Sequence, residues 1–336
     1  MTTVAILGAG AWGTAMAIHL AARAAAKPRV TLWTRDAAQA RAMSSSRRNA
    51  RYLPDVALPP SMVVSSDLAE AVRAELLIAA TPVAALPALV RELEALGTRV
   101  PLIWLSKGFV VAPELPSGVA LAHQVIAPLW RAPVGVVSGP TFAEEVARGL
   151  PAALTVAATA PQLAATVAAL LRGESMRAYE SDDIAGVEIG GAIKNVLAIA
   201  AGASDGLRFG YNARAALITR GLAETGRLSA ALGGKRETLM GLAGLGDLVL
   251  TCTGDLSRNR RVGLALAQGK RLPDILAELG HVAEGVTAAI AARALAVHHG
   301  VEMPICEVVC RVLHENLPAR AAVEELLSRE PRVERN

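Results

Sequence analysis

Cysteine is scarce in this sequence: Cys252, Cys306 and Cys310 are the only three among 336 residues. Their number is odd and their spacing is not that of a metal site, so the sequence predicts a reduced cytoplasmic protein without a bound metal. Cys306 and Cys310 are spaced one turn apart on a predicted helix, and we interpret both as packing residues.

Lysine is scarce too, and arginine carries most of the positive charge. The five lysines form no basic run, and the formal net charge is only +4. The lack of a basic arm argues against a nucleic-acid partner, whereas a modest positive excess suits small molecules that carry phosphate. The lysines are Lys27, Lys107, Lys194, Lys235 and Lys270.

The chain enters a predicted strand almost at once, and we therefore expect no signal peptide. Residues 149–171 form the longest run without charge, which is long enough to suggest a membrane span. Pro151, Pro161 and Gln162 interrupt this run. We interpret it as a buried strand followed by an amphipathic helix, and we expect no integral membrane segment.

The length leaves room for two domains, and the first half of the chain alternates strands with helices. Near-continuous apolar strands joined by helices indicate an α/β fold, a Rossmann-type doubly wound sheet buried on both faces. Strands are predicted at residues 4–7, 30–33, 62–64, 76–80, 101–104, 134–137 and 152–157, with helices at 14–25, 67–73 and 83–96.

From about residue 184 onward the sequence carries only helical spacing. We therefore predict a Rossmann domain at residues 1–185, followed by an all-helical C-terminal domain at residues 186–336. Within that second domain, helices are predicted at residues 212–232, 260–267, 272–279, 287–299, 307–314 and 319–327.

A glycine motif, G-x-G-x-x-G, directly follows the first predicted strand and precedes a helix. In this context Gly8 would permit a tight turn, Gly10 the approach of a pyrophosphate, and Gly13 the close packing of helix on strand. The phosphates would lie on the N–H groups at the helix start. The motif predicts binding of a dinucleotide; the alternative is a glycine turn that only packs.

The end of the second predicted strand bears on which dinucleotide is bound. An NAD site commonly has an acidic residue there, on the ribose 2′-hydroxyl. This chain reads Trp33-Thr34-Arg35-Asp36, with an arginine before the acid. Arg35 would pair with a 2′-phosphate or stack on adenine, so the sequence admits NADP(H) beside NAD(H).

Lys194 interrupts a long apolar run, residues 186–201, that predicts a core helix. The small residues Gly190, Gly191 and Ala192 would let another segment approach the backbone just before it. One interpretation is a snorkelling lysine with its head in water. The other is a lysine in a cleft, where partial desolvation lowers its pKa towards neutrality and suits it to proton transfer.

Two further segments carry polar groups in suggestive settings. A glycine-rich stretch at residues 241–246 leads to Asp247, which is a candidate active-site carboxylate, a helix cap or a salt-bridge partner. Ser257-Arg258-Asn259-Arg260-Arg261 at a helix start is either an anion site or a solvated basic turn. Together with Lys107 and Lys194, these groups match what the reduction of a phosphorylated ketone requires.

Ten motifs, taken together, resemble those of the bacterial NAD(P)-dependent glycerol-3-phosphate dehydrogenases over nearly the whole length of the chain. Two departures, S-K-G for T-K-G and Ala11 where serine is common, remove no group that the mechanism needs. The matching motifs are G-A-G-A-W-G at Gly8, N-A-R-Y-L-P at Asn49, S-K-G at Ser106, S-G-P-T-F-A at Ser138, G-V-E-I-G-G-A-I-K-N at Gly186, G-Y-N-A-R-A-A-L-I-T-R-G at Gly210, G-L-A-G-L-G-D-L-V-L-T-C-T at Gly241, S-R-N-R-R at Ser257, A-E-G-V at Ala283 and V-E-M-P-I at Val301.

The resemblance implies that Lys194 is the proton acceptor in the oxidation direction, with Lys107 and Asp247 beside it. The implied substrate residues are Lys107, Gly139, Thr141, Lys194, Asn195, Asp247, Thr251, Ser257, Arg258 and Asn259. The implied cofactor residues are Gly8, Gly10, Ala11, Trp12, Gly13, Arg35, Lys107, Ala143, Arg258, Val282 and Glu284.

The same resemblance implies a reaction and its setting. NAD(P)H would reduce dihydroxyacetone phosphate to sn-glycerol 3-phosphate, mainly in that direction, to supply glycerophospholipid synthesis. A cytoplasmic homodimer is expected.

Two rivals remain at this level. The 3-hydroxyacid and 6-phosphogluconate dehydrogenases share the Rossmann half and a lysine–asparagine helix, and S-R-N-R-R argues against them. A nucleotide-sensing binding protein that lost catalysis would have no use for a proton donor, so the intact lysines and Asp247 argue against it.

Overall fold

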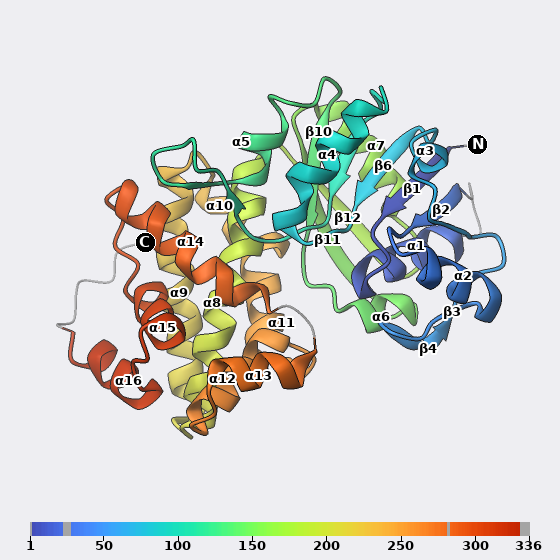
Figure 1. Ribbon diagram of the computed structural model, residues 1–336. Coiled ribbons are helices and arrows are strands. Elements are labelled where there is room, and N and C mark those ends of the chain that lie inside the picture. Colours follow the sequence, from blue (N-terminus) through green and yellow to red (C-terminus); the bar gives the residue numbers. More distant parts are fainter. Residues whose placement is uncertain (1, 23–27, 281–282, 330–336) are drawn as a thin grey trace. The chain divides into compact units, whose positions relative to one another are not determined.

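The computed structural model describes residues 2–22, 28–280 and 283–329. They form two compact units (Figure 1). The first holds the residues up to Val110 together with Ala122–Ile184, and the second holds Val111–Leu121 together with the residues from Ala185. Residues 111–121 therefore belong with the second unit, whereas the sequence placed them inside a first domain that ends at residue 185.

A twisted sheet forms the middle of the first unit, and among the described residues it has eight strands in the order β12-β11-β10-β7-β6-β1-β2-β5. All neighbouring pairs are parallel except β10 with β11. The strands are β1 (Thr3–Leu7), β2 (Arg29–Trp33), β5 (Val63–Ser65), β6 (Leu76–Ala79), β7 (Leu102–Trp104), β10 (Val134–Ser138), β11 (Ala152–Ala158) and β12 (Met176–Ser181). Because β2 lies on one side of β1 and β6 on the other, the winding reverses between β1 and β6, where open α/β sheets bind their ligands.

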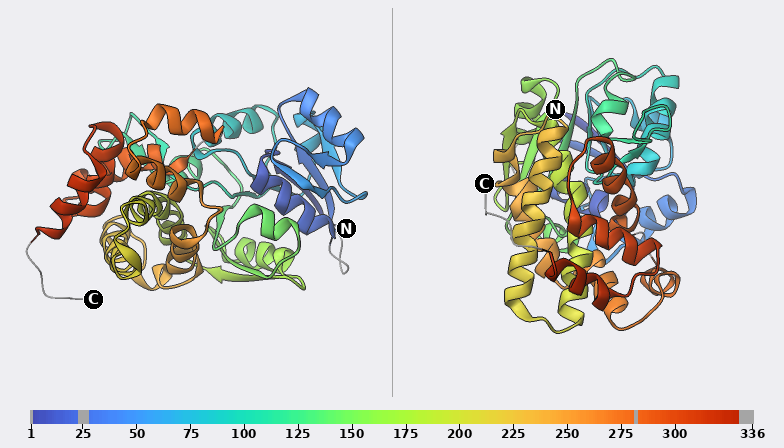
Figure 2. Two further views of the ribbon diagram at one scale, coloured as in Figure 1. Left: turned by 90° about the horizontal axis from the view of Figure 1, so that it is seen from below. Right: turned by 90° about the vertical axis from the view of Figure 1, so that its left-hand side faces the viewer.

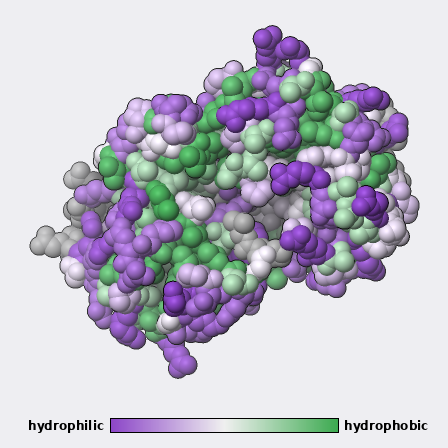
Figure 3. Space-filling model, viewed as in Figure 1, coloured by the Kyte–Doolittle hydropathy of each residue, from purple (hydrophilic) through white to green (hydrophobic). Residues whose placement is uncertain are grey.

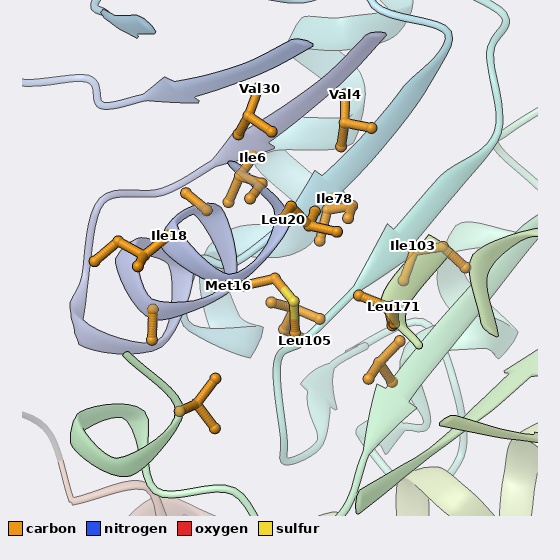
Figure 4. Packing of buried hydrophobic residues seen from close by; sticks show 14 of the residues in the cluster. Val4, Ile6, Met16, Ile18, Leu20, Val30, Ile78, Ile103, Leu105 and Leu171 are labelled. Atoms are coloured by element: carbon orange, nitrogen blue, oxygen red, sulfur yellow. The ribbon is translucent and has the colours of Figure 1, made fainter. Parts of the chain in front are cut away.

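Helices cover both faces of this sheet because the strands are apolar on both sides. Figure 4 shows one face, where Met16 and Leu20 of the first helix pack against Ile6 and Ile78 of the strands. Leu77 and Trp104 point to the other face and are fully buried as well. The helices are α1 (Ala11–Ala22), α2 (Ala37–Ser46), α3 (Leu68–Ala71), the 3₁₀ turn η1 (Val83–Ala85), α4 (Leu86–Ala95), α5 (Ala122–Ile126), α6 (Ala143–Ala147) and α7 (Pro161–Leu171).

Short ladders complete the strands: β3 (Arg48–Asn49) pairs with β4 (Leu53–Ala57), and β8 (Val110–Val111) pairs with β9 (Val119–Ala120). The predicted α/β class is confirmed, and residues 149–171 do form a strand and a helix, β11 and α7. Up to residue 184 the sequence analysis missed α2, α5, α6, β12 and these ladders, and it did not foresee that β11 runs antiparallel to β10. Polar or mixed composition in those segments gives no clear period.

The second unit is built around one long helix, α8 (Ile184–Gly206), with α9 (Gly210–Ala231) beside it (Figure 2). Glycines let other helices touch the α8 backbone: a Cβ on Gly202 would lie 2.0 Å from Arg260 O, and one on Gly263 2.0 Å from Ile199 O. The remaining elements are α10 (Arg236–Leu239), the π-helical turn η2 (Leu242–Gly246), α11 (Asp247–Thr253), α12 (Arg258–Ala267), α13 (Leu272–Leu279), α14 (Glu284–His298), α15 (Pro304–His314) and α16 (Ala319–Leu327).

Helix α8 is the one unbroken described helix that is long and apolar enough to cross a membrane, and 89% of its most apolar window is buried. Burial of that extent is the mark of a core helix rather than of a lipid-facing one. The view in Figure 3 shows hydrophilic side chains interspersed with apolar ones over the visible surface. Cys306 and Cys310 are fully buried in α15, which confirms their interpretation as packing residues.

Candidate functional site

The glycine loop lies at the reversal point of the sheet, between the end of β1 and the start of α1. Gly8 has φ +125°, and a Cβ there would lie 2.8 Å from Ala80 O at the end of β6. A Cβ on Gly13 would lie 2.0 Å from Gly8 O, so α1 sits directly on the loop. Among the described residues, no neighbouring atom lies within 4 Å of a Cβ built on Gly10. The first and third glycines are thus required by packing, while the second leaves open space at a helix start, as a pyrophosphate requires.

Asn49 holds this loop in place. It is buried, and its Nδ2 donates to Ala9 O (2.9 Å) and to Thr14 Oγ1 (2.8 Å). Gln39 Nε2 donates to the same carbonyl oxygen at 3.1 Å. Two amide side chains therefore fix the loop from outside. Asn49 belongs to one of the motifs quoted above, but no role could be predicted for it, because nothing local shows that its side chain contacts Ala9, forty residues earlier.

Arg35 and Asp36 have different tasks at the end of β2. Asp36 Oδ1 accepts from Ala38 N (2.8 Å) and Gln39 N (3.1 Å), so this carboxylate caps α2. Arg35 is exposed and makes no ion pair with any described residue. The cap uses the acid that an NAD site would place on the ribose, and it leaves the arginine available for a 2′-phosphate.

Three predicted substrate residues come together after β7 and β10, which are neighbours in the sheet. Lys107 Nζ donates to Gly139 O at 3.3 Å, and Thr141 Oγ1 donates to the same oxygen at 3.1 Å. Gly139 has φ +153°, and a Cβ on it would lie 2.8 Å from Leu154 Cα. The loop can therefore lie close against β11 only with glycine at this position.

The remaining predicted cofactor residues of the first unit lie on α1 and α6, which pack against each other. Ala11 and Trp12 form the first turn of α1, and Ala143 begins α6; all three are half-buried. They flank the glycine loop and its helix start. Of the predicted cofactor residues in the second unit, which are Arg258, Val282 and Glu284, Val282 lies outside the described residues.

Lys194 is 8% exposed, and its Nζ is 2.8 Å from Asp247 Oδ1 and 2.8 Å from Thr251 Oγ1. Asp247 is 1% exposed. Thr251 in turn donates to Asp247 O at 2.6 Å. The snorkelling interpretation of Lys194 is therefore wrong: its ammonium is buried, paired and oriented. Asp247 is its salt-bridge partner.

A close approach of two backbones brings these groups together. A Cβ on Gly190 would lie 2.5 Å from Ala243 O in η2. Gly190 precedes Lys194 by four residues, and Ala243 precedes Asp247 by four, so the contact lies one turn before the ion pair on both segments. This confirms that a small residue before Lys194 lets another segment approach, and the approaching segment is the glycine-rich stretch that leads to Asp247.

Amide groups join three helices beside this cluster. Asn259 Nδ2 on α12 donates to Asn195 Oδ1 on α8 at 2.9 Å, and Gly285 N on α14 donates to Asn259 Oδ1 at 3.0 Å. Asn195 Nδ2 lies 3.4 Å from Glu284 Oε2. The predicted residues Asn195, Asn259 and Glu284 therefore form one chain of contacts. Gly285 permits it, since a Cβ there would lie 2.5 Å from Asn195 O.

The residues of the basic segment at the start of α12 have different partners. Ser257 caps the helix by accepting from Arg260 N at 3.2 Å. Arg258 is exposed and makes no ion pair with a described residue. Arg260 is different, because it forms ion pairs within the protein. The segment is thus a capped helix start with Arg258 available to an anion, rather than a wholly solvated turn.

Comparison with known protein families gives matches over both halves of the chain. A family model described as the N-terminus of NAD-dependent glycerol-3-phosphate dehydrogenase matches residues 3–164, and the model of the C-terminus matches residues 183–324. The chain belongs to this family. The resemblance seen in the sequence is confirmed, and with it the class of NAD(P)-dependent oxidoreductases. Both rival interpretations are thereby set aside.

Individual relatives are similar over the full length. A glycerol-3-phosphate dehydrogenase of Aromatoleum aromaticum, named for NAD(P)+, is 55% identical and the alignment covers 98% of this chain and 99% of that protein. Its namesake in Nitrosospira multiformis is 53% identical with the same coverage. The crystal structure of glycerol-3-phosphate dehydrogenase from Coxiella burnetii has a TM-score of 0.91 at 42% identity, covering 98% of this chain and 99% of the other.

Proposed function

We propose that this chain interconverts dihydroxyacetone phosphate and sn-glycerol 3-phosphate, acting mainly as a reductase. The observation that carries the proposal is the buried Lys194–Asp247 pair, at 2.8 Å, in the same unit as the free Arg258 at a helix start. The first is a proton-transfer group and the second an anion-binding group. A phosphorylated ketone needs both.

Bound NAD(P)H supplies the hydride in this reaction. The protein would hold it by the glycine loop. The open space at Gly10 and the N–H groups at the start of α1 suit a pyrophosphate, and Asn49 keeps the loop in shape. Arg35 would bind the 2′-phosphate of NADPH. These contacts support a cofactor role for residues 1–185.

Lys194 acts as the general acid in reduction and the general base in oxidation. As an ammonium it donates a proton to the oxygen of the ketone, and as an amine it recovers that proton from the alcohol. Asp247 and Thr251 fix the position of Nζ, so the donor is oriented before the substrate arrives. Positioned acid catalysis of this kind contributes about 10²–10⁴-fold.

The other polar groups bind and polarise the substrate. Lys107 would polarise the carbonyl, with Gly139 and Thr141 beside it. Ser257, Arg258 and Asn259 would hold the phosphate, and Asn195 would align the reacting end. These assignments give residues 186–336 the acid–base and phosphate-binding roles, while Lys107, Gly139 and Thr141 of residues 1–185 contribute to the substrate site. We further propose a cytoplasmic homodimer that supplies glycerophospholipid synthesis.

The test mixes the purified protein with NADPH and dihydroxyacetone phosphate and follows the absorbance of the reduced nicotinamide. The proposal predicts a rapid fall. Unphosphorylated dihydroxyacetone serves as the matched control and should give a very small fall. If phosphorylated and unphosphorylated ketones react equally, the phosphate site is wrong; if neither reacts, the proposed reaction is wrong.

A further inference from the structure

The first turn of α12 concentrates positive charge without a compensating acid of its own. It carries Arg258, Arg260 and Arg261, and no acidic residue lies in that turn. A helix start is itself positive, equivalent to about half an elementary charge, so three guanidinium groups there oppose folding unless anions face them. What faces each arginine therefore decides its function.

Arg260 forms an ion pair with Asp205, which lies in the last turn of α8. Its Nε and Nη2 donate to Asp205 Oδ2 at 3.0 and 2.7 Å. Arg214 of α9 donates to the same oxygen at 2.8 Å. The three side chains are only 12%, 12% and 17% exposed for Arg260, Asp205 and Arg214. One carboxylate thus joins three helices in a setting that salt screens weakly.

Arg260 has a second carboxylate partner, Asp255, which differs from Asp205 in its exposure. Its Nη1 donates to Asp255 Oδ1 at 2.9 Å, but the Asp255 side chain is 97% exposed. An exposed pair of this kind contributes little. The same arginine therefore has one buried and one solvated carboxylate partner, and only the buried one can fix its position.

Position matters because Arg260 is coupled to the proposed phosphate ligands. Its own N–H donates to Ser257 Oγ at 3.2 Å, and Arg258 lies two residues before it. Its backbone also rests on α8, since a Cβ on Gly202 would lie 2.0 Å from Arg260 O. The guanidinium and the backbone of Arg260 thus hold the first turn of α12 against α8 at two points.

We propose that Asp205 and Arg260 are positioning residues that set the aim of Arg258 and Ser257 at the substrate phosphate. This rests on the proposed function and adds a specificity role to residues that touch no substrate. Without the pair, the first turn of α12 keeps its glycine contact with α8 and the Asn259–Asn195 hydrogen bond but loses the ion pair beside Arg258, so the direction of Arg258 is set less firmly. The loss then falls on the phosphate and not on the acid–base cluster.

The experiment compares Arg260→Gln and Asp205→Asn with the matched control Asp255→Asn. For each variant, KM and kcat are measured with dihydroxyacetone phosphate and with unphosphorylated dihydroxyacetone at saturating NADPH, and Tm is recorded. Arg260→Lys keeps a positive charge opposite Asp205, and it is used in place of Arg260→Gln if Arg260→Gln does not fold. The KM of Arg260→Lys for dihydroxyacetone phosphate should lie between those of wild type and Arg260→Gln.

The expected result is a rise of about tenfold in KM for dihydroxyacetone phosphate in Arg260→Gln and Asp205→Asn, within the range of coupling seen for residues in one ion-pair network. The rate with dihydroxyacetone should change by less than about twofold, and Asp255→Asn should behave as wild type. A lower Tm with an unchanged KM would reduce the pair to a purely stabilising role and overturn the proposal. Equal losses for both ketones would overturn it too. A wild type that does not prefer the phosphorylated ketone would instead refute the proposed function, and the inference with it.

Discussion

The two units of this molecule carry their candidate sites in different ways. In the first, the site is mainly backbone: a turn at Gly8, open space at Gly10 and the N–H groups of a helix start. In the second, it consists of charged side chains removed from water, with Lys194 and Asp247 only 9% and 2% exposed in their side chains.

The difference has an energetic consequence. The glycine loop has no side chain to remove, so its own contacts are weakened only by adding atoms. A buried ion pair fails when either partner is removed, because the other charge is then left without compensation at a cost of about 3–5 kcal/mol. Mutations in the glycine loop and in the Lys194–Asp247 pair should therefore separate cofactor binding from chemistry.

The largest effect is expected at Lys194. Lys194→Ala should lower kcat by about 10²–10⁴-fold, because the proton donor is lost. Lys194→Arg should recover little, since a guanidinium stays protonated and has a different shape. Steady-state kinetics with dihydroxyacetone phosphate measures this. A near-normal kcat in Lys194→Ala would show that the buried pair is only structural.

Arg258 comes next. Arg258→Ala should reduce kcat/KM for dihydroxyacetone phosphate by about 10²-fold, the upper range for a hydrogen bond to a charged group. Binding of the remote phosphate also helps to align the ketone, so kcat should fall as well. The rate with dihydroxyacetone should hardly change. An equal fall for both ketones would remove Arg258 from the phosphate site.

Arg35 tests the first unit in the same manner. Arg35→Ala should raise KM for NADPH by about 10–100-fold, equivalent to about 1.5–3 kcal/mol, because one charge-assisted contact with the 2′-phosphate is lost. KM for NADH should stay nearly constant. Parallel titrations with the two cofactors give the answer, and equal losses would mean that Arg35 only stacks on adenine.

Glu224 offers a buried carboxylate without an ion pair to a described residue, in contrast to Asp247. It is 2% exposed, and it accepts from Ile305 N (2.9 Å) and Cys306 N (3.3 Å) at the start of α15. Burial raises the pKa of Glu224 to about 7 from its ordinary 4.5, against the lowering effect of those two N–H groups. Between pH 4.5 and about 7, the Glu224 carboxyl is therefore protonated in the folded protein and ionised in the unfolded chain.

Stability should consequently fall as pH rises from about 4.5 to about 7, and Glu224 should add no further slope above that. The total is at most about 3 kcal/mol. Glu224→Gln keeps the shape and removes the titration, so its unfolding free energy should be flatter over this window. Urea denaturation at several pH values measures it, and an unchanged slope would assign the pH dependence to other groups.

The difference between the two sites also explains which of them could be predicted from the sequence. The glycine loop is local, so a strand, three spaced glycines and a helix were enough to predict it. Lys194 and Asp247 are 53 positions apart, and spacing left both open to bland interpretations. The chemical needs of ketone reduction suggested that they act together, and the family resemblance then assigned their roles.

The supporting roles of Asn49 and of the Asp205–Arg260 pair could not be predicted. Polar residues that position a site cannot be told from other polar residues in the sequence, because their partners are distant along the chain. In the same way, no periodic pattern placed Val111–Leu121 with the helical unit.

The most direct test of the separation is the dissociation constant of NADPH, measured for Lys194→Ala beside Gly10→Ala. Lys194→Ala should bind NADPH within about twofold of wild type. Gly10→Ala should bind it about tenfold more weakly, roughly the cost of one charge-assisted hydrogen bond. Its Tm should stay unchanged, because the new Cβ meets no neighbouring atom of the described residues within 4 Å. Weakened binding in Lys194→Ala, or unaltered binding in Gly10→Ala, would contradict the account.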